Sequence, residues 1–396
     1  MELIRQLVKL ESKNPPQASR IYGYNAVALY ESVVNGIPGN KSLAGQINGY
    51  NTAATTANTV DYIAVLNETM YNTNKLIFGA TMSSTNAAKL DSMYNATLAD
   101  RKTRIAIDVI NNSVDYGKAV ADAIKACITA DNFTQTRLMV YTVPSRLINP
   151  AFWAPTDAVN LNPAEPFWGA LKCLSMPTAD MCEVPSLVRF DTATSSSFYA
   201  QALELYTVNQ NLTHNQKDIA LWWADGAGAS PTPPGHWVAI ENQLAINLHL
   251  NLAQAAEMYA MVGIAEMDAF ISCWYSKYKY NLLRPQTYIN DYIAGAGTWH
   301  SFLKTPAFPE YPSGHSVSSG ASAEVLTSLF GTISFLDKTN TSMGLTPRFY
   351  NNFYDAANEA ALSRLYGGIH YREANENGIR QGKALAQYLL RTVKLK

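Results

Sequence analysis

Apolar side chains recur at three- and four-residue spacings along most of this chain, and this helical period constrains the fold more than any other feature. The first run follows Asn14 and the two prolines after it, which supply a helix start, and places Ile21, Tyr24 and Val27 on one face. Similar runs follow at 61–72, 116–130, 243–259, 264–280, 319–330, 353–365 and 375–390. The pattern predicts an all-α protein.

Alternation of apolar and polar residues, which marks a half-buried strand, is scarce. Residues 138–143 give the best strand candidate, although nothing nearby offers a partner strand or an Asn-Gly turn. Residues 144–185 are rich in Pro, Asn and aromatic side chains and predict a long packed connection rather than a flexible linker. We therefore expect two four-helix-bundle-like halves, residues 1–200 with long loops and residues 201–396, sharing one core.

Composition and charge exclude several classes of protein. Apolar residues make up 47% of the 396 residues and charged residues 15%, and no apolar run is long enough to span a bilayer. The formal net charge is -1, so no global positive field would attract nucleic acid or an anionic membrane, and any anion site must be local. We expect a monomer or small homo-oligomer with no nucleic-acid partner and no membrane insertion. The sequence shows no signal peptide, and we expect a secreted or periplasmic protein whose signal is absent from this chain.

The four cysteines form no C-x-x-C pair of the kind that binds zinc or runs redox chemistry. Buried structural thiols are therefore the expectation. Cys173 and Cys182 flank a short loop, and a disulfide between them is the alternative for an exported protein.

Three short stretches concentrate cationic side chains and histidines. In K-Y-K-Y-N-L-L-R-P, Lys277 and Arg284 are seven residues apart, which on a continuous helix places both on one face. In P-S-G-H, Ser313 is a suitable helix N-cap, and the N–H groups that follow it favour a tetrahedral oxyanion. In S-R-L-Y-G-G-I-H, a glycine pair predicts a helix end that turns His370 back toward Arg364.

Each stretch alone also fits an ordinary structural role. Exposed cations on a helix, a serine N-cap and a hydrogen-bonded core histidine are all common. A P-S-G-H string, however, is expected by chance well under about once in a hundred chains of this length. Three such stretches in this order therefore favour a shared anion site.

The combination K-x6-R-P, P-S-G-H and S-R-x5-H, over residues 277–370, resembles the signature of the vanadium-dependent haloperoxidase and type 2 phosphatidic acid phosphatase superfamily. Both branches bind a tetrahedral or trigonal bipyramidal oxyanion, and vanadate mimics phosphate in geometry and charge. The resemblance implies a haloperoxidase-type helical fold with a vanadate site in the C-terminal half.

The resemblance also implies a role for each motif residue. His370 would bind vanadium through a ring nitrogen, or attack phosphorus in a phosphatase. His315 would take a proton from incoming peroxide, or protonate a leaving alcohol, and Lys277 would polarise the bound peroxide. The residues implied to surround the oxyanion are Lys277, Arg284, Ser313, Gly314 and Arg364.

Three further positions are similar to those of haloperoxidases. Trp274 stands where these enzymes carry a tryptophan near the halide, and Phe308 where chloroperoxidases and bacterial relatives have phenylalanine. The segment W-W-A-D-G-A-G-A-S-P-T-P-P-G-H-W is similar to the one whose aspartate pairs with the last arginine, so Asp225 would hold Arg364. Core packing of the rings and turn capping by the aspartate are the competing readings.

A fourth position weakens the phosphatase branch. Soluble phosphatases carry an aspartate four residues after the last histidine to orient it, and here that position is Ala374. Glu373 and Asn375 are the candidates to replace it. The resemblance therefore implies oxidation of halide, iodide or bromide rather than chloride, by hydrogen peroxide to hypohalous acid. The alternative is an acid phosphatase that hydrolyses phosphomonoesters through a phosphohistidine.

Overall fold

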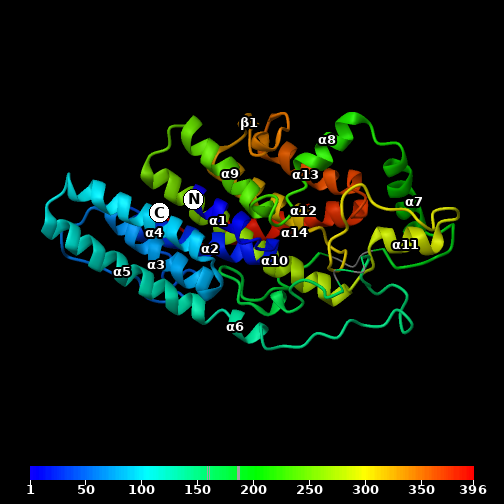
Figure 1. The fold of residues 1–396 in the computed structure, drawn as a ribbon, viewed down its shortest axis with the longest axis horizontal. Helices are drawn as coiled ribbons and strands as arrows, with labels where there is room; N and C mark the ends of the chain where they lie inside the picture. The colour runs from blue at the N-terminus through cyan, green and yellow to red at the C-terminus, as the bar shows by residue number, and fades with distance from the viewer. Residues whose placement is uncertain (158, 160, 185–187) are drawn as a thin grey trace.

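The computed structural model describes residues 1–157, 159, 161–184 and 188–396, and helices dominate them (Figure 1). The helices are α1 Glu2–Leu10, α2 Pro15–Val33, α3 Tyr62–Phe78, α4 Ser84–Lys102, α5 Ile107–Thr129, α6 Phe133–Thr136, α7 Ser197–Gln210, α8 His214–Trp222, α9 Thr232–Asn247, α10 Leu252–Tyr280, α11 Pro285–Tyr292, α12 Gly314–Phe330, α13 Phe353–Tyr366 and α14 Arg372–Thr392. Two short strands, β1 Phe335–Asp337 and β2 Arg348–Tyr350, form an antiparallel hairpin. The predicted all-α class is confirmed.

Side-chain caps explain where several helices begin. Asn14 caps α2, accepting from the Gln17 N–H at 3.0 Å while the Gln17 side chain accepts from the Asn14 N–H. Asn251 starts α10 with the same arrangement. The single helical run predicted at 243–259 is therefore wrong, because α9 ends at Asn247 and the chain turns through His249, at φ 51°, before α10 begins.

Helix α10 runs through the centre of the molecule (Figure 1). It packs along α2 on one side, and on another it contacts α12, which packs along α14. Helices α3, α4 and α5 form an extension at one end. One hydrophobic cluster includes Tyr24 of α2, Phe270 of α10 and Leu389 of α14, so the core draws on both ends of the chain. The division into halves at residue 200 stays a prediction.

Helices α12 and α14 approach each other closely because glycines face the contact. A Cβ atom built on Gly320 would lie 2.6 Å from the Ile379 carbonyl oxygen, and one on Gly382 would lie 2.0 Å from the Val317 carbonyl oxygen. On Gly378 it would meet the Ser316 side chain at 2.6 Å. The position of the α12 N-terminus therefore depends on residues that lack a side chain.

The strand predicted at 138–143 is wrong. Residues 138–145 are irregular, and Leu138 and Val140 are 81% and 89% exposed. An isolated alternating segment has no partner for its backbone groups, and here it runs along the outside of the molecule as part of the connection after α6. The hairpin that does form, with Phe335 opposite Tyr350 and Asp337 opposite Arg348, was not expected.

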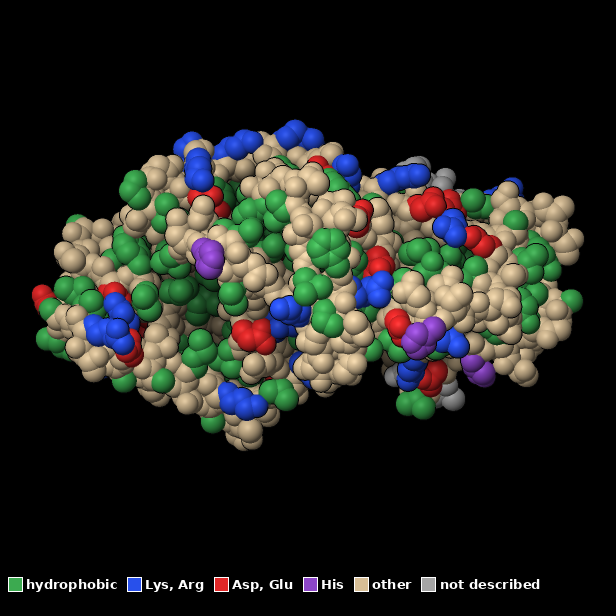
Figure 2. Space-filling view, turned by 90° about the horizontal axis from the view of Figure 1, so that it is seen from above, with side chains coloured by type: hydrophobic (Ala, Val, Ile, Leu, Met, Phe, Trp, Pro, Cys, Tyr) green, Lys and Arg blue, Asp and Glu red, His purple; other side chains and the backbone are tan. Residues whose placement is uncertain are grey.

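Three further expectations concern the cysteines, membrane insertion and the charge on the surface. All four cysteines are free thiols, so the Cys173–Cys182 disulfide is not formed. Among the residues that the structure describes, no helix is long and apolar enough to cross a membrane. Figure 2 shows cationic and anionic side chains scattered over the face in view rather than gathered in one patch.

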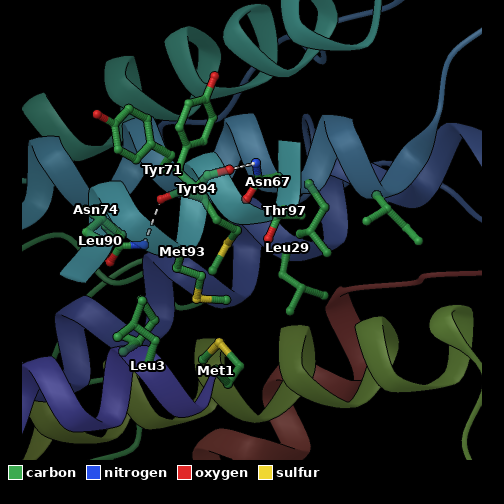
Figure 3. A pocket seen from close by; sticks show the side chains of 14 residues that line it. Met1, Leu3, Leu29, Asn67, Tyr71, Asn74, Leu90, Met93, Tyr94 and Thr97 are labelled. Carbon is green, nitrogen blue, oxygen red and sulfur yellow. Dashed lines mark hydrogen bonds between the residues drawn. The ribbon is translucent and has the colours of Figure 1, made fainter. Parts of the chain in front are cut away.

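An apolar pocket of about 170 Å³ lies among α1, α3 and α4, with Leu29 of α2 also in its wall (Figure 3). Met1, Leu3, Leu90 and Met93 line it, and none of its 14 lining side chains carries a charge. A wall without Lys, Arg or His does not suit a multiply charged oxyanion, and the three motifs lie elsewhere.

Candidate active site

Lys277 is fully buried in the last turns of α10. Its ammonium group donates to the carbonyl oxygens of Pro309 at 3.1 Å, Glu310 at 2.9 Å and Pro312. These bonds tie the segment before Ser313 to α10. Burial lowers the pKa of Lys277 to about 7.

The prediction that Arg284 and Lys277 share one helix face is wrong. Helix α10 ends at Tyr280 because Asn281 adopts a left-handed conformation, φ 48°, and Arg284 instead precedes α11 as its N-cap residue. The two cations still converge. The Lys277 nitrogen lies 5.2 Å, and the Arg284 guanidinium carbon 4.8 Å, from the centre of the Phe308 ring.

The Arg284 guanidinium lies beside His370 and shows which ring nitrogen carries the hydrogen. Its Nε donates to the Phe308 carbonyl at 2.8 Å and its Nη1 to the Ile369 carbonyl at 2.9 Å, while Nη1 lies 3.1 Å from His370 Nε2. Arginine only donates, so Nε2 is the accepting nitrogen and Nδ1 carries the ring hydrogen. Nη2 of Arg284 is buried without a partner among the described residues.

Glu310 accepts the hydrogen bond that this Nδ1–H donates. Its Oε1 accepts from His370 Nδ1 and from the Tyr371 N–H, both at 2.9 Å, and its Oε2 is buried without a partner in the described part of the chain. Burial lowers the pKa of His370, and Arg284, Lys277, Arg364 and His315 lower it further, in that order. The imidazole is therefore neutral, with the Nε2 lone pair held away from the carboxylate.

The two residues that the sequence offered to orient His370, Glu373 and Asn375, bind other groups instead. Glu373 accepts from the Val188 N–H at 2.9 and 3.0 Å, and the Asn375 side chain accepts from Ser316 at 3.4 Å. Glu310 was missed although it lies inside F-P-E-Y-P-S-G-H. The signal that was available is a single carboxylate within an otherwise uncharged motif.

Ser313 caps α12, accepting from the Ser316 N–H at 3.4 Å, and is fully buried. The first N–H groups of α12, beginning with Gly314, have no partner within the helix and can donate to a ligand. A Cβ atom on Gly314 would lie 3.4 Å from the Trp274 ring, so the indole packs directly beneath this helix start.

Arg364 is held differently from the prediction. Its Nε donates to Ser363 Oγ at 2.9 Å and its Nη2 to the carbonyl oxygens of Trp223 and, at 3.4 Å, Ala220. The expected Asp225–Arg364 bond is wrong, because the C-terminal end of α8 presents backbone carbonyls to the guanidinium. The turn at Gly367 and Gly368 does bring His370 back, with Gly368 at φ 74°.

Asp225 instead faces two histidines. Its Oδ2 lies 3.0 Å from His236 Nδ1 and 3.9 Å from His315 Nε2, and Nε2 of His315 makes no hydrogen bond within the described residues. Burial lowers the pKa of His315 well below its usual value, and Arg364 and His236 lower it further. His315 is therefore a neutral imidazole beside a carboxylate, able to accept a proton.

Trp274 and Phe308 pack against each other with ring centres 5.0 Å apart and the ring planes tilted by 49°. The Trp274 N–H donates to the Ala164 carbonyl at 3.2 Å, which also accepts from the Tyr278 hydroxyl at 2.6 Å. The indole N–H is thus occupied by the long connection before α7. Phe308 is only partly buried, and its ring lies against both cations.

The comparisons with known proteins agree with this geometry. Residues 257–395 match the family described as the VCPO second helical-bundle domain. Vanadium chloroperoxidase of Curvularia inaequalis is 30% identical over 124 residues, which cover 26% of this chain and only 20% of that protein. A solved structure of a bacterial vanadium-dependent iodoperoxidase is 33% identical, covers 100% of this chain and 95% of its own, and superposes with a TM-score of 0.92.

This chain belongs to the vanadium-dependent haloperoxidase family. An apo-type bacterial vanadium-dependent chloroperoxidase shares the fold at 14% identity and a TM-score of 0.73, over 94% of this chain. The resemblance that the three motifs suggest is thus confirmed over the whole fold.

The residues of this haloperoxidase-family site fit vanadate. Three buried cations, Lys277, Arg284 and Arg364, surround a neutral histidine, and a trianionic oxyanion would compensate their charge. Arg284 Nη2 and His315 Nε2 are buried polar atoms without protein partners among the described residues, as expected for groups that bind a ligand.

Proposed function

We propose that this chain is a haloperoxidase that holds vanadate and uses hydrogen peroxide to oxidise halide to hypohalous acid. Iodide is oxidised most readily and bromide less readily. The observation that carries the proposal is the neutral His370, oriented by Glu310 and placed beside three buried cations. The overall reaction is balanced as halide, hydrogen peroxide and one proton giving hypohalous acid and water. Full-length similarity to a bacterial iodoperoxidase supports iodide.

Six residues would hold the cofactor. His370 Nε2 would give its lone pair to vanadium in place of the hydrogen bond that it now accepts from Arg284, while Lys277, Arg284 and Arg364 would neutralise the oxygens. Ser313 and the Gly314 N–H at the start of α12 add hydrogen bonds. Bound vanadate, in its highest oxidation state, acts as a Lewis acid toward peroxide and needs no redox-active side chain.

The remaining chemistry belongs to protein groups. His315, neutral and next to Asp225, takes a proton from the incoming peroxide and later returns it to the departing oxygen. Lys277, fixed by three carbonyl oxygens, stabilises negative charge on oxygen. Phe308, partly exposed beside the cations, forms an apolar wall from which water is excluded.

One assay tests the proposal. Metal-free protein, with and without orthovanadate, is given peroxide and iodide, bromide or chloride. We expect vanadate-dependent oxidation of iodide, weaker oxidation of bromide and least of chloride. Iodide oxidation that is unchanged without vanadate would contradict the proposal.

Glu310 also favours a second function, phosphomonoester hydrolysis. The lack of an aspartate at Ala374 argued against a nucleophilic histidine, but Glu310 orients His370 from another direction. The same metal-free protein would then hydrolyse an activated phosphomonoester, and orthovanadate would inhibit that hydrolysis. Release of phosphate that survives His370→Ala would exclude this route.

A further inference from the structure

His236 of α9 is a buried histidine that none of the three motifs contains. Its ring makes contacts at both nitrogens: Nδ1 lies 3.0 and 3.2 Å from the two Asp225 oxygens, and Nε2 lies 2.8 Å from Asp337 Oδ2. The side chain is 0% exposed, as is that of Asp337. Trp223 stacks on the ring with centres 4.1 Å apart.

These contacts fix the charge of His236. A carboxylate only accepts, so both ring nitrogens must carry hydrogen, and the ring is an imidazolium. Burial opposes the charge, yet Asp225 and Asp337 together raise the pKa of His236 to about 9. The ring therefore keeps its charge throughout the neutral range.

The far carboxylate is itself firmly held. Asp337 ends β1, and its oxygens accept from Trp222 Nε1 at 3.0 Å, from the Thr339 N–H at 2.9 Å and from Gln243 at 3.4 Å. The near carboxylate, Asp225, sits on a loop at φ 45° and makes its hydrogen bonds to His236. His236 thus connects the rigid hairpin to a loop residue that faces the acid–base histidine.

We propose that His236 is a positioning residue for halide oxidation: as an imidazolium between Asp225 and Asp337, it fixes the Asp225 carboxylate opposite His315. The proposal rests on the proposed function, since it assigns His315 the proton transfer. Charged and titratable groups surround His315 from several elements: Arg364 on α13, His236 on α9, Lys277 on α10, and Asp225 and the neutral His370 on loops. Among them His236 is the cation bound directly to Asp225.

Removing the imidazolium should move the protonation of His315 in one direction only. Asp225 would lose the cation that balances it, and its attraction for a proton on His315 would increase. His315 would then become protonated at a higher pH, and the acid limb of the pH–rate profile would move upward. A merely structural histidine would change stability and leave this limb in place.

The test compares His236→Gln with wild type, both loaded with vanadate. We expect the acid limb of kcat for iodide oxidation to rise by about one pH unit. On the acid side of both limbs this shift should lower kcat by up to about tenfold, whereas the dissociation constant for orthovanadate should stay within about twofold. An NMR titration of the His315 ring without vanadate should show the same upward shift.

A control variant distinguishes the loss of the His236 charge beside Asp225 from the loss of any buried ion pair. Asp131→Asn removes the comparably buried partner of Arg20, far along the chain from the motifs, and should lower thermal stability without moving the limb. Asp337→Asn, which keeps an acceptor for His236, should move the limb in the same direction by less. An unmoved His315 titration in His236→Gln, or equal profiles for His236→Gln and Asp131→Asn, would overturn the inference. Absent iodide oxidation in wild type with a shifted His315 titration would instead overturn only the proposed function.

Discussion

Glu310 and His370 are joined by a 2.9 Å hydrogen bond between Oε1 and Nδ1. Glu310 belongs to the segment that precedes α12, and His370 to the turn that follows α13, so the bond connects two of the three motifs. It assigns the ring hydrogen to Nδ1 and leaves Nε2 as the nitrogen beside Arg284. The orientation of the proposed vanadium ligand therefore depends on a residue outside the motif that contains it.

Replacing Glu310 should weaken vanadate binding. Glu310→Ala removes the acceptor that orients His370, and we expect the dissociation constant for orthovanadate to rise about 10- to 100-fold, as for other groups that orient a metal ligand. Glu310→Gln keeps a carbonyl acceptor and should lose less. Isothermal titration of orthovanadate into the metal-free protein measures both.

The matched control is Glu373→Gln, because Glu373 was the acidic candidate from the sequence and instead binds the Val188 N–H. This variant should bind orthovanadate as wild type does. A larger loss for Glu373→Gln than for Glu310→Ala would mean that the assignment is wrong.

The charge of His236 should appear in stability as well as in rate. Its folded pKa of about 9 lies above the usual 6.5, so its contribution is fully present below pH 6.5 and is lost as pH rises through 9. The wild type should have a higher free energy of unfolding than His236→Gln. This difference should be larger at pH 6 than at pH 10, by on the order of 3 kcal/mol. Urea unfolding at both pH values measures this difference, and an equal gap at both would contradict a charged His236.

The α12–α14 contact should not tolerate side chains at its glycines. Gly382→Ala places a methyl group 2.0 Å from the Val317 carbonyl, and we expect a loss of roughly 1–3 kcal/mol or more in the free energy of unfolding. Gly297→Ala is the control, since its nearest neighbour would be 3.9 Å away, the Asn290 carbonyl. Thermal unfolding of the two variants should differ clearly; equal melting temperatures would show that the helices are less closely packed.

Trp274 should contribute packing rather than a hydrogen bond to halide. Its N–H is used by the Ala164 carbonyl, so Trp274→Phe should cost about 1 kcal/mol of stability and change the KM for iodide less than about threefold. Steady-state iodide oxidation at fixed peroxide measures the effect. A tenfold rise in KM with unchanged stability would indicate that the indole N–H contacts the halide.

Local patterns were sufficient to predict half of the helices and the motif cations. The spacing of apolar residues is a property of each segment, and it gave α2, α13 and α14 closely and the greater part of α3, α5, α10 and α12, but it did not reveal α1, α4, α6 to α8 or α11. It failed at 243–259, where a capping box at Asn251 interrupts the apolar run, and at Arg284, where Asn281 ends α10. Both failures arise from single residues that override a periodic pattern.

Contacts between distant segments could not be predicted in this way. Glu310 meets His370 across 60 residues, and His236 meets Asp337 across 101. Glu310 is the single carboxylate of its motif, but nothing local in the sequence indicates that His370 is its partner, and His236 does not differ in the sequence from a core residue of the same type. Their pairing depends on how α9, α12 and the β1–β2 hairpin pack, which is decided by the tertiary fold.

The most direct test of the central claim is a crystal of this protein soaked in orthovanadate and measured for anomalous scattering from vanadium. We predict one vanadium bound to His370 Nε2, with oxygens contacting Lys277, Arg284 and Arg364, and no such peak in His370→Ala. Vanadium bound elsewhere, or bound at the same place in His370→Ala, would contradict the account.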